Sequence, residues 1–291
     1  MRTRLLGPGA QPVSVIGYGG MHLSITDRPP EPEGIRVLHA ALDAGMTLID
    51  TADAYCLEAS ETGHNERLIA QALKSWGGAC DRIVVATKGG IVRHHGRWDR
   101  DGRPAHLKAA CEASLRSLGV DQIALYQLHA PDPAVPFEDS VGALADLKRD
   151  GKIRWVGLSN VSVDQIRSAA AITPVASVQN RLNPFFREAL TDGVVAHCAA
   201  QGIGFLAYSP TGGGRLTRKL PEHPILAAIG RRLGVTAHTV CLAWVLAQGP
   251  SVIAIPSARR IEHAQASAAA AEVSLKPADL AAITEADFDR S

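Results

Sequence analysis

The sequence has few aromatic residues, almost no net charge and no long apolar run. Only 4% of the 291 residues are aromatic, and 30 basic side chains against 29 acidic ones leave a formal net charge of +1. Because nucleic-acid binders depend on clustered Lys and Arg to contact phosphates, this balance argues against a nucleic-acid partner. The longest apolar run, Val240–Ala247, is far shorter than the roughly 20 residues of a membrane helix, so we expect no membrane association.

Cysteine is also scarce, and its spacing is irregular. An odd number of scattered cysteines is typical of reduced thiols rather than of a disulfide framework, and no spacing suggests a zinc site. Behind Arg2 and Arg4 the N-terminus has no apolar segment of the kind that a signal peptide needs. We therefore expect a cytoplasmic protein without a metal ion. The five cysteines are Cys56, Cys80, Cys111, Cys198 and Cys241.

What the sequence does contain is a globular composition, with 46% hydrophobic and 20% charged residues. Eight short runs are mostly apolar rather than alternating, as expected for parallel strands that are buried on both faces. A helical pattern follows most of the runs. The predicted strands are Ser14–Gly19, Met46–Thr51, Arg82–Lys88, Ile123–His129, Arg154–Ser159, Val175–Asn180, Ile203–Ser209 and Val252–Pro256.

The predicted helices carry ordinary start and stop signals. One of them begins at Pro104 and ends before Gly119, because proline is tolerated in a first turn and glycine commonly follows a last turn. The expected helices are Gly34–Ala44, Asn65–Lys74, Pro104–Leu118, Phe137–Arg149, Ser162–Ala171, Gly193–Ala200, Pro224–Leu233 and Thr236–Ala247.

Eight strand–helix repeats without a break in composition predict one (β/α)8 TIM barrel that spans residues 1–291 as a single domain. The alternative is an open doubly wound sheet. That fold carries a glycine fingerprint directly after its first strand, which is missing here. The similar pattern at residues 202–207 leads into a strand instead of a helix.

In such barrels, active sites lie where the strands end, at the C-terminal face. Asp50, Lys88 and His129 end three successive predicted strands, and Tyr55 follows Asp50 closely. An ammonium group near a phenol lowers the phenol pKa from about 10, and a carboxylate holds the ammonium in place. Tyr55 is therefore a candidate proton donor, Lys88 and Asp50 its tuning groups, and His129 a hydrogen-bond donor to a substrate oxygen.

The segment Leu48–Tyr55, followed by Asn65-Glu66, resembles the opening motif of the aldo-keto reductases. Later segments match the family in order and each ends a predicted strand. The matching segments are Ala86–Lys88, Leu125–His129, Gly157–Asn160, Val178–Asn180, Ala207–Pro210 and Ile255-Pro256.

This resemblance implies a barrel with a short β-hairpin across its bottom, which residues 4–13 could form. It also implies reversible hydride transfer between a nicotinamide and a small-molecule aldehyde or ketone. Tyr55 would be the general acid, Lys88 and Asp50 would tune it, and His129 would orient the carbonyl.

The resemblance further implies contacts to the cofactor. Amide and hydroxyl groups would hold the nicotinamide carboxamide, an aromatic ring would stack on the nicotinamide, and small residues after the seventh strand would approach the pyrophosphate. Positive charge at the last helix start favours the 2′-phosphate of NADPH over NADH, although Ala266 and Ser267 depart from the usual adenine contacts. The implied contacts are Ser159, Asn160, Gln179, Tyr208, Ser209, Gly213, Gly214, Ser257, Arg259, Arg260 and His263.

Two other functions remain open from the sequence. One is a non-catalytic regulatory subunit that keeps the barrel and the nucleotide. The other is an aldolase in which Lys88 forms a Schiff base with its substrate. Residues 93–103 are expected to form a mobile loop at the barrel mouth, where substrate selectivity is determined. No role is predicted for Cys56, and the sequence indicates neither the physiological substrate nor the oligomeric state.

Overall fold

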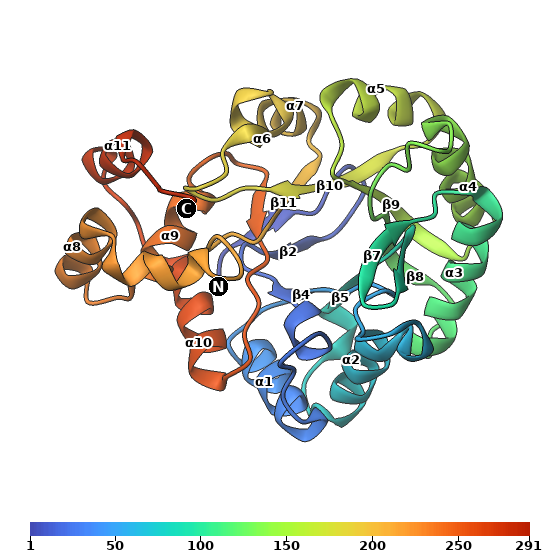
Figure 1. Ribbon diagram of the computed structural model, residues 1–291, viewed down its shortest axis with the longest axis horizontal. Coiled ribbons are helices and arrows are strands. Elements are labelled where there is room, and N and C mark those ends of the chain that lie inside the picture. The colour runs from blue at the N-terminus through green and yellow to red at the C-terminus, as the bar shows by residue number, and fades with distance from the viewer.

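The fold is a barrel of eight parallel strands, seen in a computed structural model that describes residues 1–291 (Figure 1). Neighbouring strands pair in the order β12-β11-β10-β9-β8-β5-β4-β3. A parallel bridge between Ile16 and Ala254 joins the two ends of this sheet, and Gly17 N donates to Ala254 O at 2.8 Å. The strands are β3 (Tyr18–Gly19), β4 (Leu48–Asp50), β5 (Val84–Gly89), β8 (Ile123–Leu128), β9 (Ile153–Ser159), β10 (Val175–Arg181), β11 (Gly204–Tyr208) and β12 (Val252–Ala254).

Helices surround the barrel on its outside (Figure 1). The predicted TIM barrel is therefore confirmed, including the helix that begins at Pro104 and stops at Gly119 with a left-handed φ of 67°. The helices are α1 (Glu31–Asp43), α2 (His64–Ser75), α3 (Pro104–Leu118), α4 (Phe137–Arg149), α5 (Val163–Ile172), α6 (Glu188–Thr191), α7 (Val194–Gln201), α8 (Pro224–Leu233), α9 (Ala237–Leu246), α10 (Ile261–Ala269) and α11 (Pro277–Glu285).

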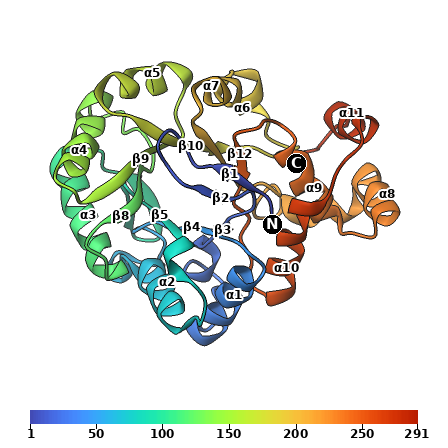
Figure 2. The ribbon, with the colours of Figure 1, turned by 180° about the vertical axis from the view of Figure 1, so that it is seen from behind.

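An N-terminal hairpin covers one end of the barrel, as Figure 2 shows from behind. Strands β1 (Thr3–Leu5) and β2 (Pro12–Ser14) pair antiparallel. Leu6, just after β1, accepts a hydrogen bond from Gly204 N at 3.1 Å, at the start of β11. Leu6 also packs with strand residues in a separate buried cluster. This end of the barrel is thus closed by apolar side chains. A polar functional site is therefore expected at the opposite end.

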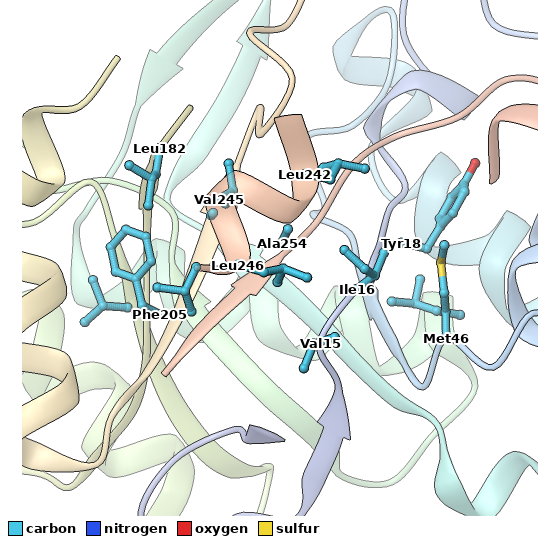
Figure 3. Close-up of a cluster of buried hydrophobic side chains, with 14 of the residues drawn as sticks. Val15, Ile16, Tyr18, Met46, Leu182, Phe205, Leu242, Val245, Leu246 and Ala254 are labelled. Atoms are coloured by element: carbon cyan, nitrogen blue, oxygen red, sulfur yellow. The ribbon is translucent and has the colours of Figure 1, made fainter. Parts of the chain in front are cut away.

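The main hydrophobic core lies between the strands and the surrounding helices. Figure 3 shows Leu242, Val245 and Leu246 of α9 near Phe205 and Ala254 of the barrel. Every residue of α9 except His238 is buried. This packing explains why α9 is apolar on all sides rather than amphipathic.

Two sequence expectations differ from the structure. The first predicted strand is divided, because β2 ends at Ser14 and β3 begins at Tyr18. The expected loop at residues 93–103 instead contains an antiparallel hairpin, β6 (Ile91–His94) and β7 (Arg97–Arg100). Its two-residue turn, His95-Gly96, has φ values of 50° and 73°, and this left-handed geometry matches the twist of a tight hairpin.

No single helix combines the length and hydropathy of a membrane span. Only α8 and α9 taken together do so, and they are bent by 95° relative to each other.

Candidate active site

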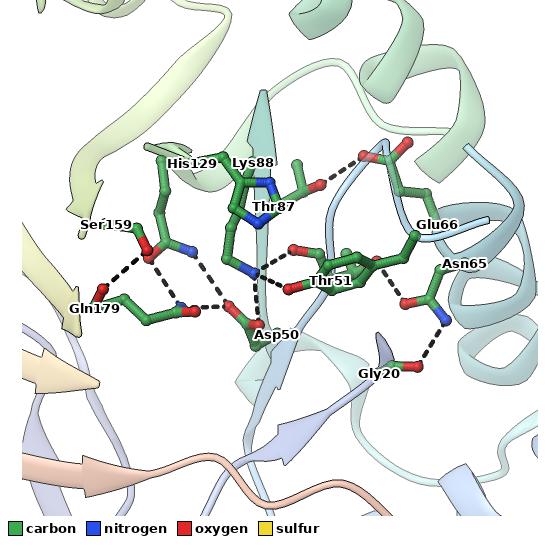
Figure 4. A network of polar contacts seen from close by, with 12 residues as sticks. Gly20, Asp50, Thr51, Asn65, Glu66, Thr87, Lys88, His129, Ser159 and Gln179 are labelled. Carbon is green, nitrogen blue, oxygen red and sulfur yellow. Dashed lines mark hydrogen bonds and ion pairs between the residues drawn. The ribbon is translucent and has the colours of Figure 1, made fainter. Parts of the chain in front are cut away.

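The Lys88 ammonium is the centre of a buried polar network at the mouth of the barrel (Figure 4). Its Nζ donates to Asp50 Oδ2 at 2.6 Å, to Tyr55 OH at 2.9 Å and to Thr51 O at 2.9 Å. All three hydrogens of the ammonium therefore have an acceptor, and the predicted grouping of Asp50, Tyr55 and Lys88 is present in the structure.

Strand register brings these three residues together. In the pairing of β4 with β5, Asp50 is opposite Ala86, so Lys88 lies two residues further along and on the same side of the sheet. The chain then turns back, because Asp53 N donates to Lys88 O at 3.3 Å and Tyr55 N donates to Ala52 O at 3.2 Å. This turn places the Tyr55 ring over the ends of the strands.

Asp50 also accepts hydrogen bonds from two buried amides. Gln179 Nε2 donates to its Oδ1 at 2.7 Å, and Gln127 Nε2 donates to the same atom at 3.2 Å. Gln127 was not among the predicted site residues. It lies opposite Lys88 in the β5–β8 register, and a fully buried glutamine inside an apolar strand is the signal that could have identified it.

Burial and charge set the protonation of the network. Burial raises the pKa of Tyr55 above its ordinary value, and Lys88 opposes this shift. Lys88 acts on the phenol in the predicted direction and lowers its pKa, but burial has the larger effect, so the pKa of Tyr55 stays above its ordinary value. Burial opposes the charged form of Lys88, but Asp50 and Tyr55 overcome it and raise the pKa of the ammonium.

His129 lies beside the tyrosine ring. The two ring centroids are 5.7 Å apart in an edge-on arrangement. Burial, helped by Lys88, lowers the pKa of His129 well below its ordinary value, so the imidazole is neutral at physiological pH. Trp98 of the β6–β7 hairpin contacts Tyr55 from another direction, with centroids 6.2 Å apart. Trp98 is a site residue that the sequence analysis missed.

Three residues predicted to bind a nicotinamide are joined by hydrogen bonds. Tyr208 OH donates to Asn160 Oδ1 at 2.8 Å, and Asn160 Nδ2 donates to Ser159 Oγ at 3.1 Å. Asn160 and Ser209 have φ values of 58° and 47°. Such backbone strain in residues other than glycine is concentrated at functional sites, and here it occurs at the ends of β9 and β11.

Comparison with known proteins identifies the family. The model of the aldo/keto reductase family matches residues 15–287. The chain belongs to the aldo/keto reductase family. It is 35% identical over 282 residues to an uncharacterized oxidoreductase of Schizosaccharomyces pombe, covering 95% of this chain and 88% of that protein.

Solved structures agree with this assignment. A glycerol dehydrogenase from Gluconobacter oxydans has a TM-score of 0.84 at 28% identity, covering 99% of this chain and 98% of the other. An aldo/keto reductase from Klebsiella pneumoniae, solved in complex with NADP and acetate, has a TM-score of 0.82 at 28% identity, covering 97% and 94%. This aldo/keto reductase is therefore an oxidoreductase with the TIM-barrel fold of its relatives.

In this aldo/keto reductase the predicted pyrophosphate segment follows β11. Gly212, Gly213 and Gly214 follow β11 and have φ values of 97°, 68° and 49°. Only glycine adopts such angles readily in succession. Gly212 N donates to Ser209 O at 2.9 Å, whereas Gly213 N and Gly214 N have no acceptor in the chain and can donate to a phosphate. The segment fits a dinucleotide for this reason.

The residues predicted to bind the 2′-phosphate lie at the start of α10. Two of them already form contacts within the chain. Arg259 Nη2 donates to Thr26 O at 3.0 Å, and Arg260 pairs with Glu262 at 2.7 Å. His263 is exposed, and Ser257 lies near Gly19. Gln179 also differs from expectation in its surroundings, because its side chain amide bonds to Asp50 rather than lying free.

Proposed function

We propose that the protein is an NADPH-dependent reductase that converts an aldehyde or ketone to an alcohol, with Tyr55 as the general acid. The observation that carries this proposal is the double contact of Lys88 Nζ, at 2.9 Å from Tyr55 OH and 2.6 Å from Asp50 Oδ2. This arrangement supplies a proton donor, a cation that stabilises the donor after proton loss, and a carboxylate that holds the cation.

The hydrogen bonds indicate a role for each residue in carbonyl reduction. Because the Tyr55 oxygen accepts from Lys88, its own hydrogen remains free to be donated to a carbonyl oxygen at the mouth. When that proton leaves, the phenolate is stabilised by an ammonium already in place, so no group has to reorganise. The neutral imidazole of His129 donates a hydrogen bond to the same carbonyl oxygen and orients it. Bound NADPH would supply the hydride.

We propose that the cofactor is held by the residues that the family resemblance implies. Ser159 and Asn160 would pair with the carboxamide, Gln179 would support them from β10, and Tyr208 would stack on the nicotinamide. Ser209, Gly213 and Gly214 would approach the pyrophosphate. A relative solved with NADP and another solved with NADPH support this cofactor class. For the 2′-phosphate we propose Ser257, Arg259, Arg260 and His263.

The geometry counts against an aldolase that uses Lys88 as a Schiff base. A Schiff base requires a neutral amine with a free lone pair. Here the ammonium donates to three acceptors, and Asp50 and Tyr55 raise its pKa against the effect of burial. Borohydride would trap substrate on Lys88 if this alternative were correct.

The direct test is to incubate the protein and NADPH with a panel of aldehydes and ketones. The loss of NADPH absorbance measures the turnover. We expect NADPH oxidation that depends on the carbonyl compound. Tight NADPH binding with no turnover across the panel would favour the regulatory-subunit alternative instead. The cytoplasmic location stays a prediction, which cell fractionation tests.

A further inference from the structure

A cavity of about 380 Å³ lies between the β6–β7 hairpin and residues 53–62. It is separate from the proposed catalytic group, because Asp50, Tyr55, Lys88 and His129 are not among its lining residues. Ala54 lines it, however, so the cavity borders the catalytic turn. Its polar lining consists of Asp53, Thr62, Arg93, Asp101, Arg103 and His106, together with the exposed His94.

Arg93 is the unusual member of this lining. Only 7% of the residue is exposed, and no carboxylate lies within 4 Å of its guanidinium, which forms no ion pair. Nη2 donates to Leu57 O at 3.1 Å, but the buried Nε and Nη1 have no acceptor. The Trp98 ring is a cation–π partner for the charge, with its centroid 4.1 Å from Arg93 Cζ, but buried donor atoms without an acceptor are still costly. An acceptor from outside the chain that bonds to Nε and Nη1 would remove this cost.

Other donors line the same cavity. His106 Nε2 is buried and has no partner. His106 lies in the first turn of α3, a helix of 15 residues whose preceding residue, Arg103, provides no side-chain cap. The first backbone N–H groups of a helix lack intrahelical acceptors and favour an anion. Arg93 thus offers two donor atoms to this space, His106 Nε2 offers another when it carries the ring proton, and the start of α3 borders the same space.

The two carboxyl groups in the lining do not cancel this positive character. Asp101 is engaged by Arg103, with contacts of 2.8 and 2.6 Å, and lies 3.6 Å from His106 Nδ1. The buried Asp53 has an unpartnered Oδ1. Burial and the neighbouring Glu66 raise the pKa of Asp53 well above its ordinary value, and a neutral carboxyl group can donate a hydrogen bond to an anion.

We propose that this cavity binds a small oxyanion, either a carboxylate or a phosphate group, with Arg93 as its principal ligand. The anion is either a free ion or the anionic end of a carbonyl substrate. Trp98 lies between the two sites, since the Arg93 Cζ atom is 4.1 Å from its ring centroid and its ring contacts Tyr55. The substrate-borne case rests on the proposed reductase function, whereas binding of the free ion does not.

Binding of inorganic phosphate and of acetate to the whole protein tests the site, with thermal shift and tryptophan fluorescence as readouts. Wild type and Arg97→Met are expected to bind alike, because Arg97 is exposed on the same hairpin and does not line the cavity. Arg93→Met is expected to bind phosphate about tenfold or more weakly, the loss of a charge-assisted hydrogen bond. Arg93→Lys keeps the cation, so it is expected to retain part of the binding.

A second measurement separates the two sources of the anion. Benzaldehyde and a carboxylated benzaldehyde are compared in wild type, Arg93→Met and Arg97→Met. A substrate-borne anion predicts that Arg93→Met raises KM about tenfold for the carboxylated aldehyde only, and that phosphate competes with that aldehyde alone. A free anion predicts phosphate binding that depends on Arg93, with equal effects on the two aldehydes.

The proposal is overturned if phosphate and acetate bind equally to wild type, Arg93→Met and Arg97→Met, or bind to none of them. Because these binding readouts need no turnover, failure of the reductase assay and failure of the anion site are distinguishable.

Discussion

The Asp50 carboxylate and the Lys88 ammonium form an ion pair of 2.6 Å whose side chains are only 4% and 1% exposed. Both charges are therefore out of water, and each depends on the other for compensation. Asp50 is further held by Gln127 and Gln179, while the ammonium reaches on to Tyr55. The pair thus connects the interior of the barrel to the proposed proton donor.

Removal of Lys88 should destabilise the fold as well as abolish activity. Lys88→Met leaves the Asp50 carboxylate buried without its cation, and breaking one partner of a buried pair costs about 3–5 kcal/mol. Denaturant unfolding measures the loss. Lys74→Met is the control, because Lys74 is exposed and forms no ion pair. An unfolding free energy equal to that of wild type would show that the buried pair contributes no stability.

Tyr55→Phe should remove the proton donor while keeping the ring. General acids contribute about 10²–10⁴-fold to rate, so we expect a loss of kcat in that range, with NADPH affinity nearly unchanged. Tyr126→Phe is the matched control, since Tyr126 is also buried but its OH points to Leu107 O, 3.4 Å away. Full activity in Tyr55→Phe would exclude this residue as the acid.

The pH dependence follows from the direction of two shifts. Reduction needs protonated Tyr55, whose pKa burial raises above its ordinary value of 10.0. The rate of reduction should therefore be constant through neutral pH and fall only above about pH 10, whereas alcohol oxidation should rise over the same range. The pKa of His129 lies well below 6.5, so titration of His129 should not change the rate between pH 6.5 and 8. A profile of kcat/KM against pH measures this, and a reduction limb near pH 7 would contradict it.

The sequence was sufficient to predict the barrel and the grouping of most of the proposed catalytic residues. Mostly apolar runs predict parallel strands, and the ends of such strands meet at one face, so Asp50, Lys88 and His129 could be placed together. The protonation of Tyr55 could not be predicted, because it depends on burial that only the folded chain defines. Gln127 and Trp98 were missed for a related reason. Their roles come from cross-strand register and from a hairpin whose turn residues, His95-Gly96, are a weak signal in the sequence.

Gly20 is another residue that only the structure identifies. A Cβ at this position would lie 2.4 Å from Asn65 Oδ1 and 3.1 Å from Asp50 O. Gly20→Ala should therefore displace Asn65 or β4, with a cost of about 1–3 kcal/mol for overpacking and a fall in kcat. Gly77→Ala is the control, because nothing lies within 4 Å of a Cβ there. Unfolding curves and turnover assays compare the two variants. Equal unfolding free energies and equal kcat values would show that Gly20 does not help to position the site residues.

The arginines at the start of α10 provide the last test, which concerns cofactor choice. Arg260 is paired with the exposed Glu262, and a surface pair of this kind is worth at most about 1 kcal/mol, so the side chain can exchange Glu262 for a phosphate. Arg259 is held by His22 O and Thr26 O, which fixes its guanidinium near the helix start.

The double variant Arg259→Ala and Arg260→Ala should therefore weaken NADPH binding at least about tenfold, while NADH binding changes little, because only NADPH carries the 2′-phosphate. Fluorescence titration with each nucleotide measures the two affinities. Arg231→Ala, on the last turn of α8, is the control for removal of surface charge. Equal losses for NADPH and NADH would mean that these arginines support the segment around His22 and Thr26 and do not recognise the phosphate.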